Sequence, residues 1–409
     1  MFLQLFHKEC KQMLKCLTYY VFLICMILFF VGQMGDFDFV KQPQPGQEDY
    51  GTKYSDNPSI IMEKTISSLA YEYALNKFAT YPIGFYKVVI LSGKKYDEIE
   101  NILCEVTGLN KEEVKTRANE FFSSEKIITG PFMPIEPSKN LNYEQFGVLM
   151  EKVDKLLGGG SRYSEMYRTQ NAQVPITYEE ALSYYQEIID KDQVTGAYAR
   201  LFCDYMGIIL AILPVFIAVT RGLRDRRARA HEVIYAHKVS SFHVIVSRYT
   251  AMVVMLFLPV LVLSLYPLSI CIYHGSSLGV SIDFFAFITY SVVWLLPTIL
   301  VSLSVGVLFT ELTETAIAII LHGFWWFVSI FTGVSQMGGG YGMNLIPRHN
   351  IVGNYEVYQE HFQILVTNRI FYTILALLLM VASVFVYEMK RKGKLHVRRK
   401  IFANRKSQL

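Results

Sequence analysis

Charged residues are scarce in this chain of 409 residues: Asp, Glu, Lys and Arg make up 18% of it, against about 25% in soluble globular proteins. The deficit is concentrated in long apolar runs, the pattern that insertion into a bilayer imposes. Because a helix rises about 1.5 Å per residue, roughly 20 apolar residues are needed to cross the hydrocarbon layer. The scarcity of charge therefore predicts an integral membrane protein and excludes an ordinary soluble domain.

Common catalytic and nucleotide-binding motifs are also missing. The segment 92–95 (SGKK) lacks the earlier glycine and the following hydroxyl residue of a phosphate-binding loop. His231-Glu232 has no second histidine at the spacing of a zinc protease, and no GxSxG elbow occurs. Six-residue steps would spread histidines 231, 237 and 243 around a helix, which disfavours a metal site. We therefore expect no enzyme, and no metal or cofactor bound by this chain.

Cysteine is sparse, at six residues, and only Cys104 lies well inside the longest hydrophilic segment. No disulfide is therefore possible within that segment.

The apolar runs predict an all-α integral membrane fold with six transmembrane helices. The first run continues past the length of a signal-peptide core and is expected to stay in the mature protein. The predicted spans are residues 17–35, 201–219, 249–273, 284–310, 315–334 and 370–387.

Residues 1–15 form an amphipathic pattern ahead of the first span. Phe2, Leu3, Phe6 and other apolar residues recur every three or four positions, while Lys8, Lys11 and Lys15 share the opposite face. This pattern predicts an N-terminal helix lying in the membrane interface, with its lysines toward lipid headgroups.

The distribution of basic residues predicts the orientation. Segments 1–16, 220–248, 311–314 and 388–409 together hold 19 basic and six acidic residues, whereas residues 36–200 hold 18 basic and 25 acidic residues. Because Lys and Arg favour cytoplasmic loops, both termini are predicted to be cytoplasmic and residues 36–200 extracellular. The basic tail, 388–409, follows directly on a span, so we interpret it as a headgroup contact and expect no nucleic-acid partner.

The chain thus divides into residues 1–35 (interfacial helix and first span), 36–200 (extracellular domain) and 201–409 (five further spans). Helix-start patterns at Asn57-Pro58, Asn110, Asn142 and Thr177 predict a mainly helical extracellular domain, with one short strand at 87–91. Asp204 near the start of the second span is expected at the outer interface, because a carboxylate is costly in the bilayer core. Four prolines in three of the spans (Pro214, Pro259, Pro267 and Pro297) predict kinks.

The inner loop, 221–248, carries the most informative pattern. Charged residues surround a short apolar patch, and a serine pair precedes the third span. Such a segment suits docking onto a partner, with charge for orientation and apolar side chains for a groove; a solvated loop that only fixes topology is the alternative. The candidate coupling residues are Arg224, Arg226, Arg227, Arg229, Glu232, Val233, Ile234, Tyr235, Lys238, Ser240 and Ser241.

Two further groups of ionisable residues have both a functional and a structural interpretation. His322 lies inside the fifth span, where an ionisable side chain is a candidate for a transport pathway; the alternative is a neutral ring hydrogen-bonded within the bundle. Glu311 and Glu314 lie three residues apart without an obvious histidine partner, and they more simply mark the inner end of the fourth span.

The order of these features resembles the permease subunits of ABC-2-type ABC transporters, mostly bacterial exporters. The likeness covers nearly the whole chain, from an N-terminal "elbow" helix and first span through an extracellular insert to five further spans. The arginine-rich loop with Glu232, the serine pair and Arg248 resembles that family's coupling region. The segments TGAYARLFCDYMG and LIPRHN resemble permeases of Gram-positive, Clostridia-like bacteria.

The resemblance implies a permease in the bacterial plasma membrane that pairs with a second permease copy or homologue. A separate ABC ATPase subunit would bind ATP and Mg²⁺ and contact residues 226–241. The expected substrate is amphiphilic: a peptide, an antibiotic or a lipid-like molecule. Two alternatives stay open, a sodium-export permease and a membrane-anchored sensor that uses its extracellular domain. The extracellular domain is larger than that of the compact members of the family.

Overall fold

The computed structural model describes residues 2–37, 39–82, 85–123, 133–228, 230–334 and 340–395. The chain forms two compact units, which we describe separately. The membrane unit comprises Met1–Gln42 and Leu182–Leu409, and the insert comprises Pro43–Ala181.

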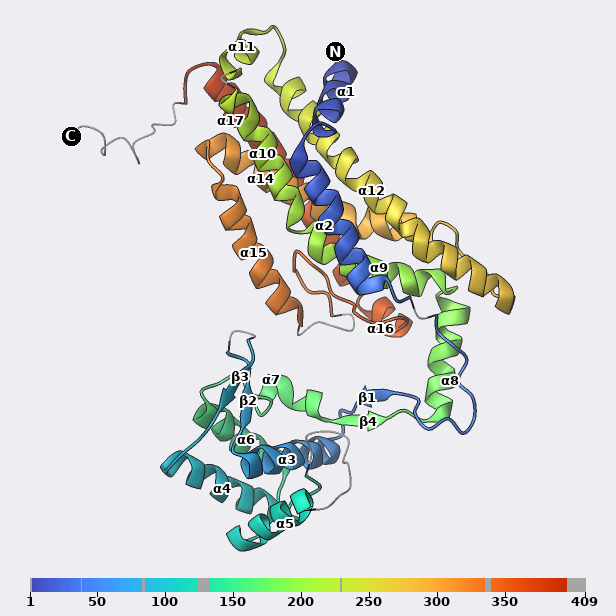
Figure 1. The fold of residues 1–409 in the computed structure, drawn as a ribbon, viewed down its shortest axis with the longest axis vertical. Coiled ribbons are helices and arrows are strands. Elements are labelled where there is room, and N and C mark those ends of the chain that lie inside the picture. Colours follow the sequence, from blue (N-terminus) through green and yellow to red (C-terminus); the bar gives the residue numbers. More distant parts are fainter. Residues whose placement is uncertain are drawn as a thin grey trace, which may run out of the picture. The chain divides into compact units, whose positions relative to one another are not determined.

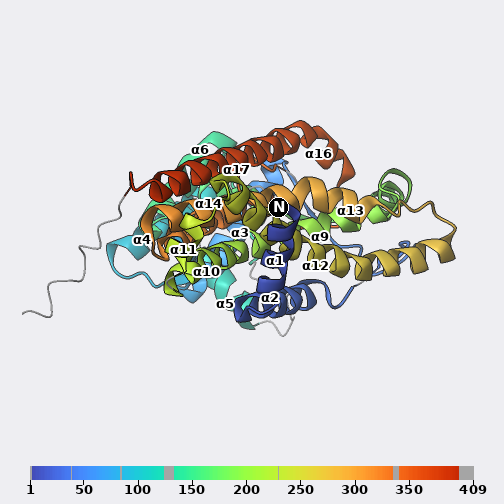
Figure 2. The same ribbon diagram turned by 90° about the horizontal axis from the view of Figure 1, so that it is seen from above.

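Among the residues described, the membrane unit contains helices and their connecting loops but no strand. Long helices run beside one another in a bundle, with α14 lying along α10 and α17 (Figures 1 and 2). Its elements in chain order are α1 (Phe2–Met13), α2 (Leu17–Met34), η3 (Glu187–Lys191), α9 (Thr195–Leu210), α10 (Leu213–Arg227), α11 (His231–Ala236), α12 (Ser241–Leu278), α13 (Ala286–Tyr290), η4 (Ser291–Leu295), α14 (Leu296–Thr313), α15 (Ile317–Val334), α16 (Tyr355–Glu360) and α17 (Phe362–Arg391).

Five helical stretches of the described chain are long and apolar enough to cross a membrane: 17–34, 195–227, 241–278, 286–313 and 362–391. The chain is therefore a multi-pass membrane protein. Helix α15 is apolar but shorter, so the count of six crossings remains a prediction. The predicted amphipathic N-terminal helix corresponds to α1, which packs against α12.

Prolines shape these helices in two ways. Pro297 follows the π-helical segment η4 within a continuous helical stretch, 286–313, whereas Pro214 stands in the first turn of α10, just after the turn at residues 211–212. This position suits proline, because the first turn needs no N–H donor inside the helix. Pro259 and Pro267 instead lie inside α12, which continues past both over 38 residues.

The core of the membrane unit is built from large apolar side chains of the central helices. Phe202 and Met206 of α9 pack with Leu256 of α12 and with Phe287 and Trp294, and all are at most 2% exposed. The outward sides of α2, α12 and α17 carry exposed apolar residues instead, as lipid-facing helices do.

The insert is mainly helical, as predicted, with two small antiparallel strand pairs, β1–β4 and β2–β3. In β1–β4, Lys53 is opposite Val174; in β2–β3, Ala79 is opposite Val88. The elements are β1 (Thr52–Tyr54), α3 (Pro58–Leu75), β2 (Phe78–Thr80), β3 (Lys87–Val89), α4 (Lys94–Thr107), α5 (Lys111–Ser123), α6 (Tyr143–Leu157), α7 (Glu165–Arg168), η2 (Thr169–Asn171) and β4 (Gln173–Pro175); α8 (Tyr178–Gln186) begins in the insert and ends in the membrane unit.

Local sequence signals set the helix starts in the insert. The Asn57 side chain accepts a hydrogen bond from the Ser59 amide (3.0 Å), with Pro58 opening α3. Asn142 and Gln145 form a capping box at α6, and Thr177 and Glu180 form another at α8. These contacts confirm the predicted helix starts, since each supplies a partner to an amide that the first turn leaves free.

A buried carboxylate joins α3, α4 and α5 in the insert. Glu100 accepts hydrogen bonds from Tyr73 (2.7 Å) and pairs with Lys111 (2.7 Å) and Lys115 (2.9 Å), and its side chain is 6% exposed. Hydrogen bonds from Lys111 and Tyr73 hold the pKa of Glu100 at about 2. The apolar core around it includes Ile66, Leu103 and Phe146.

Candidate functional site

The connection between α10 and α12 is ordered around the short helix α11. Arg391, at the end of α17, donates hydrogen bonds to the carbonyls of Tyr235 (3.0 Å), His237 (2.6 Å) and Val239. The Tyr235 ring meets the edge of Tyr387 at 5.3 Å, and burial raises the pKa of its hydroxyl. One guanidinium thus fixes three carbonyls within residues 235–239 of the connection to the bundle.

The predicted apolar patch is divided by this packing. Ile234 and Tyr235 are half-buried against the bundle, whereas Val233 is 63% exposed. Glu232 and Lys238 are exposed as well. The surface available to a partner is therefore an apolar side chain between two opposite charges.

The serine pair starts the following helix. Ser240 caps α12 by accepting a hydrogen bond from the His243 amide (3.3 Å). Ser241 is buried, and its hydroxyl donates to the carboxylate of Glu388 on α17. Ser241 thus fastens the connection to α17, while the exposed Ser240 caps the start of α12.

The candidate arginines have different surroundings. Arg226 is half-buried and pairs with Glu314, with Glu311 at 3.6 Å. Arg224 and Arg227 are exposed, and Arg224 donates to the carbonyl of Gln12 (3.5 Å). Arg229 lies outside the described residues.

Glu311 and Glu314 belong to a second charged contact, which joins α14 to α10 and α17. Lys390 approaches Glu314 at 3.2 Å and donates to the backbone carbonyl of Glu311. Burial alone would raise the pKa of Glu314, but the charges of Arg226 and Lys390 lower it below its usual range. The two carboxylates serve as anchors of helix ends in this arrangement.

A charge network that the sequence reasoning missed fastens α1 to the bundle. Glu9 accepts hydrogen bonds from Arg221 at Nε (2.6 Å) and Nη2 (2.7 Å) and from Arg248 (3.3 Å). Asp225 accepts from Arg221 (3.0 Å) and Arg248 (2.5 Å). One signal was available: Glu9 is the only acidic residue among the first 35 positions.

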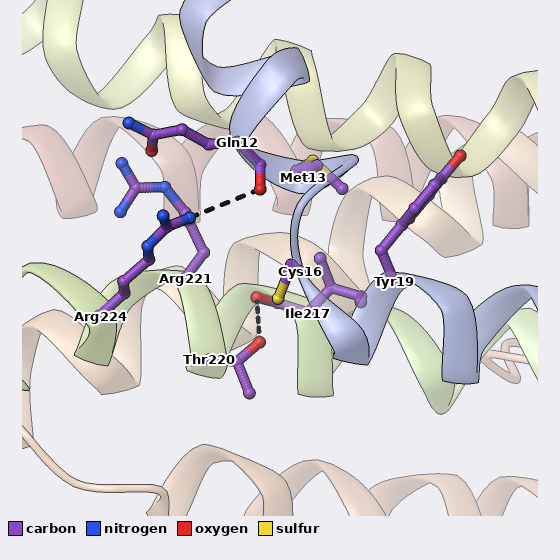
Figure 3. A pocket seen from close by; sticks show the side chains of 8 residues that line it. All are labelled: Gln12, Met13, Cys16, Tyr19, Ile217, Thr220, Arg221 and Arg224. Carbon is purple, nitrogen blue, oxygen red and sulfur yellow. Dashed lines mark hydrogen bonds between the residues drawn. The ribbon is translucent and has the colours of Figure 1, made fainter.

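A small cavity lies beside this network, where α1 turns into α2 and both approach α10 (Figure 3). Its volume is about 20 Å³, enough for about one water molecule. Gln12 and Arg224 line it, and the side-chain oxygen of Gln12 is buried without a partner among the described residues.

His322 lies at the break between α9 and α10. The turn at residues 211–212 interrupts the helical hydrogen bonds there, which leaves nearby backbone carbonyls in need of other partners. Nε2 of His322 is 2.6 Å from the carbonyl of Ala211 and 2.6 Å from the Ser302 hydroxyl, and Trp326 donates to the carbonyl of Ile208 (2.9 Å). Side chains of α15 thus replace hydrogen bonds lost at the break.

Within the described ranges, no group of three or more His, Cys, Asp or Glu side chains has the arrangement of a metal site. Comparisons with family models, with curated proteins and with solved structures found no match to this chain.

Proposed function

We propose that the chain is the membrane-spanning permease subunit of an ATP-driven ABC exporter in a bacterial plasma membrane. It would cross the membrane six times, with both termini and the α10–α12 connection in the cytoplasm and the insert outside. A separate ABC ATPase would bind ATP and Mg²⁺, and a second permease copy or homologue would complete the path of an amphiphilic substrate.

The observation that carries this proposal is the manner in which α11 is held. Its backbone is fixed to α17 by Arg391, while Glu232, Val233 and Lys238 face outward. A solvated loop that only sets topology would need neither this attachment nor an exposed valine between charges. A short rigid helix between two spans is suited to receive a push from a partner and pass it to both.

The hydrogen bonds that hold α11 would transmit a movement of this helix to the rest of the bundle. Helix α11 follows α10 and precedes α12, and the same end of the bundle is cross-linked by Arg226 with Glu314 and by Arg221 and Arg248 with Glu9. Movement of α11 would therefore be shared among α1, α10, α12, α14 and α17. Coupling of nucleotide hydrolysis to a rearrangement of the membrane helices requires such a shared movement.

The test is co-purification of this chain with a candidate ABC ATPase subunit expressed beside it, followed by ATP hydrolysis in lipid nanodiscs. Val233→Asp, Glu232→Ala and Arg227→Ala are expected to weaken association by at least about tenfold, or about 1.4 kcal/mol. Val148→Asp is the matched control, because Val148 is 71% exposed on the insert. Unaltered association and hydrolysis in all three variants would refute the docking surface, and labelling of Val233→Cys from outside intact cells would refute the topology.

A further inference from the structure

A cavity of about 230 Å³ lies between η4 and α17. Val293 and Trp294 line one side and Leu365, Val366 and Arg369 the other. Apart from Arg369 and a few hydroxyl groups, the lining is apolar. The cavity is smaller than the 300–1,000 Å³ typical of sites for drug-sized ligands, so its occupant is a single chain rather than a bulky molecule.

The cavity opens onto the outward surface of the bundle. Val293 is 50% exposed and Phe362, at its rim, is 41% exposed. In a membrane-spanning helix such side chains face lipid. A ligand would therefore reach the cavity from the hydrocarbon phase.

Arg369 brings a buried positive charge to this apolar cavity. The residue is 3% exposed, and its guanidinium donates to neutral acceptors: the side chain of Asn368 (2.9 Å), the carbonyl of Trp294 (2.9 Å) and the hydroxyl of Thr298 (2.8 Å). Among the described residues, no carboxylate lies within ion-pair distance of it. Two further contacts, to the carbonyls of Asn344 and Leu345, are long at 3.3 Å each.

The other buried arginines of this part of the bundle are neutralised. Arg200 pairs with Asp192 at 2.5 Å, and Arg348 pairs with Asp204 at 2.8 Å. Asp204 is itself fully buried, and its carboxylate is compensated by this pairing. Arg369 differs from these two arginines because no carboxylate of the described residues pairs with it. An uncompensated charge is costly in a buried, apolar environment.

We infer that the cavity binds a single-chain lipophilic carboxylate, such as a fatty acid. The chain occupies the apolar lining, and the carboxylate lies against Arg369, whose charge it neutralises. A carboxylate matches the fork of a guanidinium and neutralises its charge, which a neutral lipid cannot do. The inference concerns binding by the chain itself and does not depend on the proposed ATPase coupling.

The test uses terminally brominated dodecanoate, with brominated dodecanol as its neutral partner, because bromine quenches nearby tryptophan. The full chain is placed in phosphatidylcholine nanodiscs at about pH 9, where the carboxyl group is ionised. Dodecanoate is expected to quench the fluorescence of Trp294 with at least about tenfold higher affinity than dodecanol, as a charge-assisted contact in a desolvated site predicts. Trp294→Phe should abolish the saturable quenching.

Three variants separate binding in the cavity from general partition into lipid. Arg369→Gln should remove the preference for the carboxylate while leaving weak quenching by both compounds. Val293→Phe should fill the cavity and abolish saturable quenching, whereas Val292→Phe, on the same turn but outside the lining, should preserve it. Equal affinity of the unmodified chain for acid and alcohol, or undiminished quenching in Val293→Phe, would overturn the inference. Because Val293→Phe retains Arg369, the test stands even where Arg369→Gln fails to fold.

Discussion

Replacing Glu9 by glutamine removes the negative charge that binds α1 to α10 and α12. The Glu9 side chain is 11% exposed and faces Arg221, which is 8% exposed, and Arg248, which is 13% exposed. Asp225 remains as the only carboxylate of the network in this variant. Two nearly buried guanidiniums then share one anion.

The cost follows from that imbalance. Breaking a buried ion pair by removing one partner costs about 3–5 kcal/mol, because the other charge stays buried and uncompensated. Asp225 still pairs with Arg248 at 2.5 Å and with Arg221 at 3.0 Å, which offsets part of this. We expect Glu9→Gln to lower the free energy of unfolding by about 3 kcal/mol.

The assay is a double-mutant cycle with Arg221→Met, measured by denaturant unfolding of the purified chain in detergent micelles. The coupling energy between Glu9 and Arg221 is expected to be about 2–3 kcal/mol. Lys11→Gln, an exposed change on the same helix, is the control and should lie within about 0.5 kcal/mol of the parent. A coupling energy near zero would refute the view that this network holds α1 in place.

Two further predictions concern the insert and the helix packing. In the insert, the pKa of Glu100 is about 2 in the folded chain and about 4.3 in the unfolded chain; the stability that this difference supplies is present above the unfolded value and lost as the pH falls toward 2. Acid unfolding followed by near-ultraviolet circular dichroism should lose this pH dependence in Glu100→Gln, and an unchanged acid transition would contradict it. In the bundle, a Cβ at Gly306 would meet Cβ of Ala218 at 2.5 Å, whereas one at Gly323 meets nothing within 4 Å. Gly306→Ala is therefore expected to cost about 1–3 kcal/mol and Gly323→Ala to be neutral or slightly stabilising in thermal unfolding; equal effects would show that α10 and α14 do not pack this closely.

The sequence predicted helices well where the signal is local. Asn142 and Thr177 were recognised as caps, because a capping contact lies within three residues of its partner. Span ends were less predictable: α12 and α17 extend beyond the apolar windows at both ends. Those extra turns contain Ser241 and Arg391, polar residues whose hydrogen bonds to distant elements make the extension favourable.

The candidate site was only partly predictable, because many of its contacts join residues that are far apart in the sequence. The loop pattern identified the segment around α11 but assigned Tyr235 and Ser241 to a free surface, whereas both pack against α17. Contacts across more than 140 positions, such as Arg391 with Tyr235 or Glu9 with Arg221, leave no trace in local spacing. The break at Pro214 was visible in the sequence, but its satisfaction by His322 required the packing of α15.

The uninterrupted length of α12 has a mechanical consequence. At about 1.5 Å per residue, its 38 residues measure about 57 Å, nearly twice the thickness of a hydrocarbon layer. Ser241, beside the α11 connection, and Leu278, at the far end, thus belong to a single rod. A displacement of one end of α12 would therefore be transmitted to the other end. Only bending at Pro259 and Pro267 would reduce it.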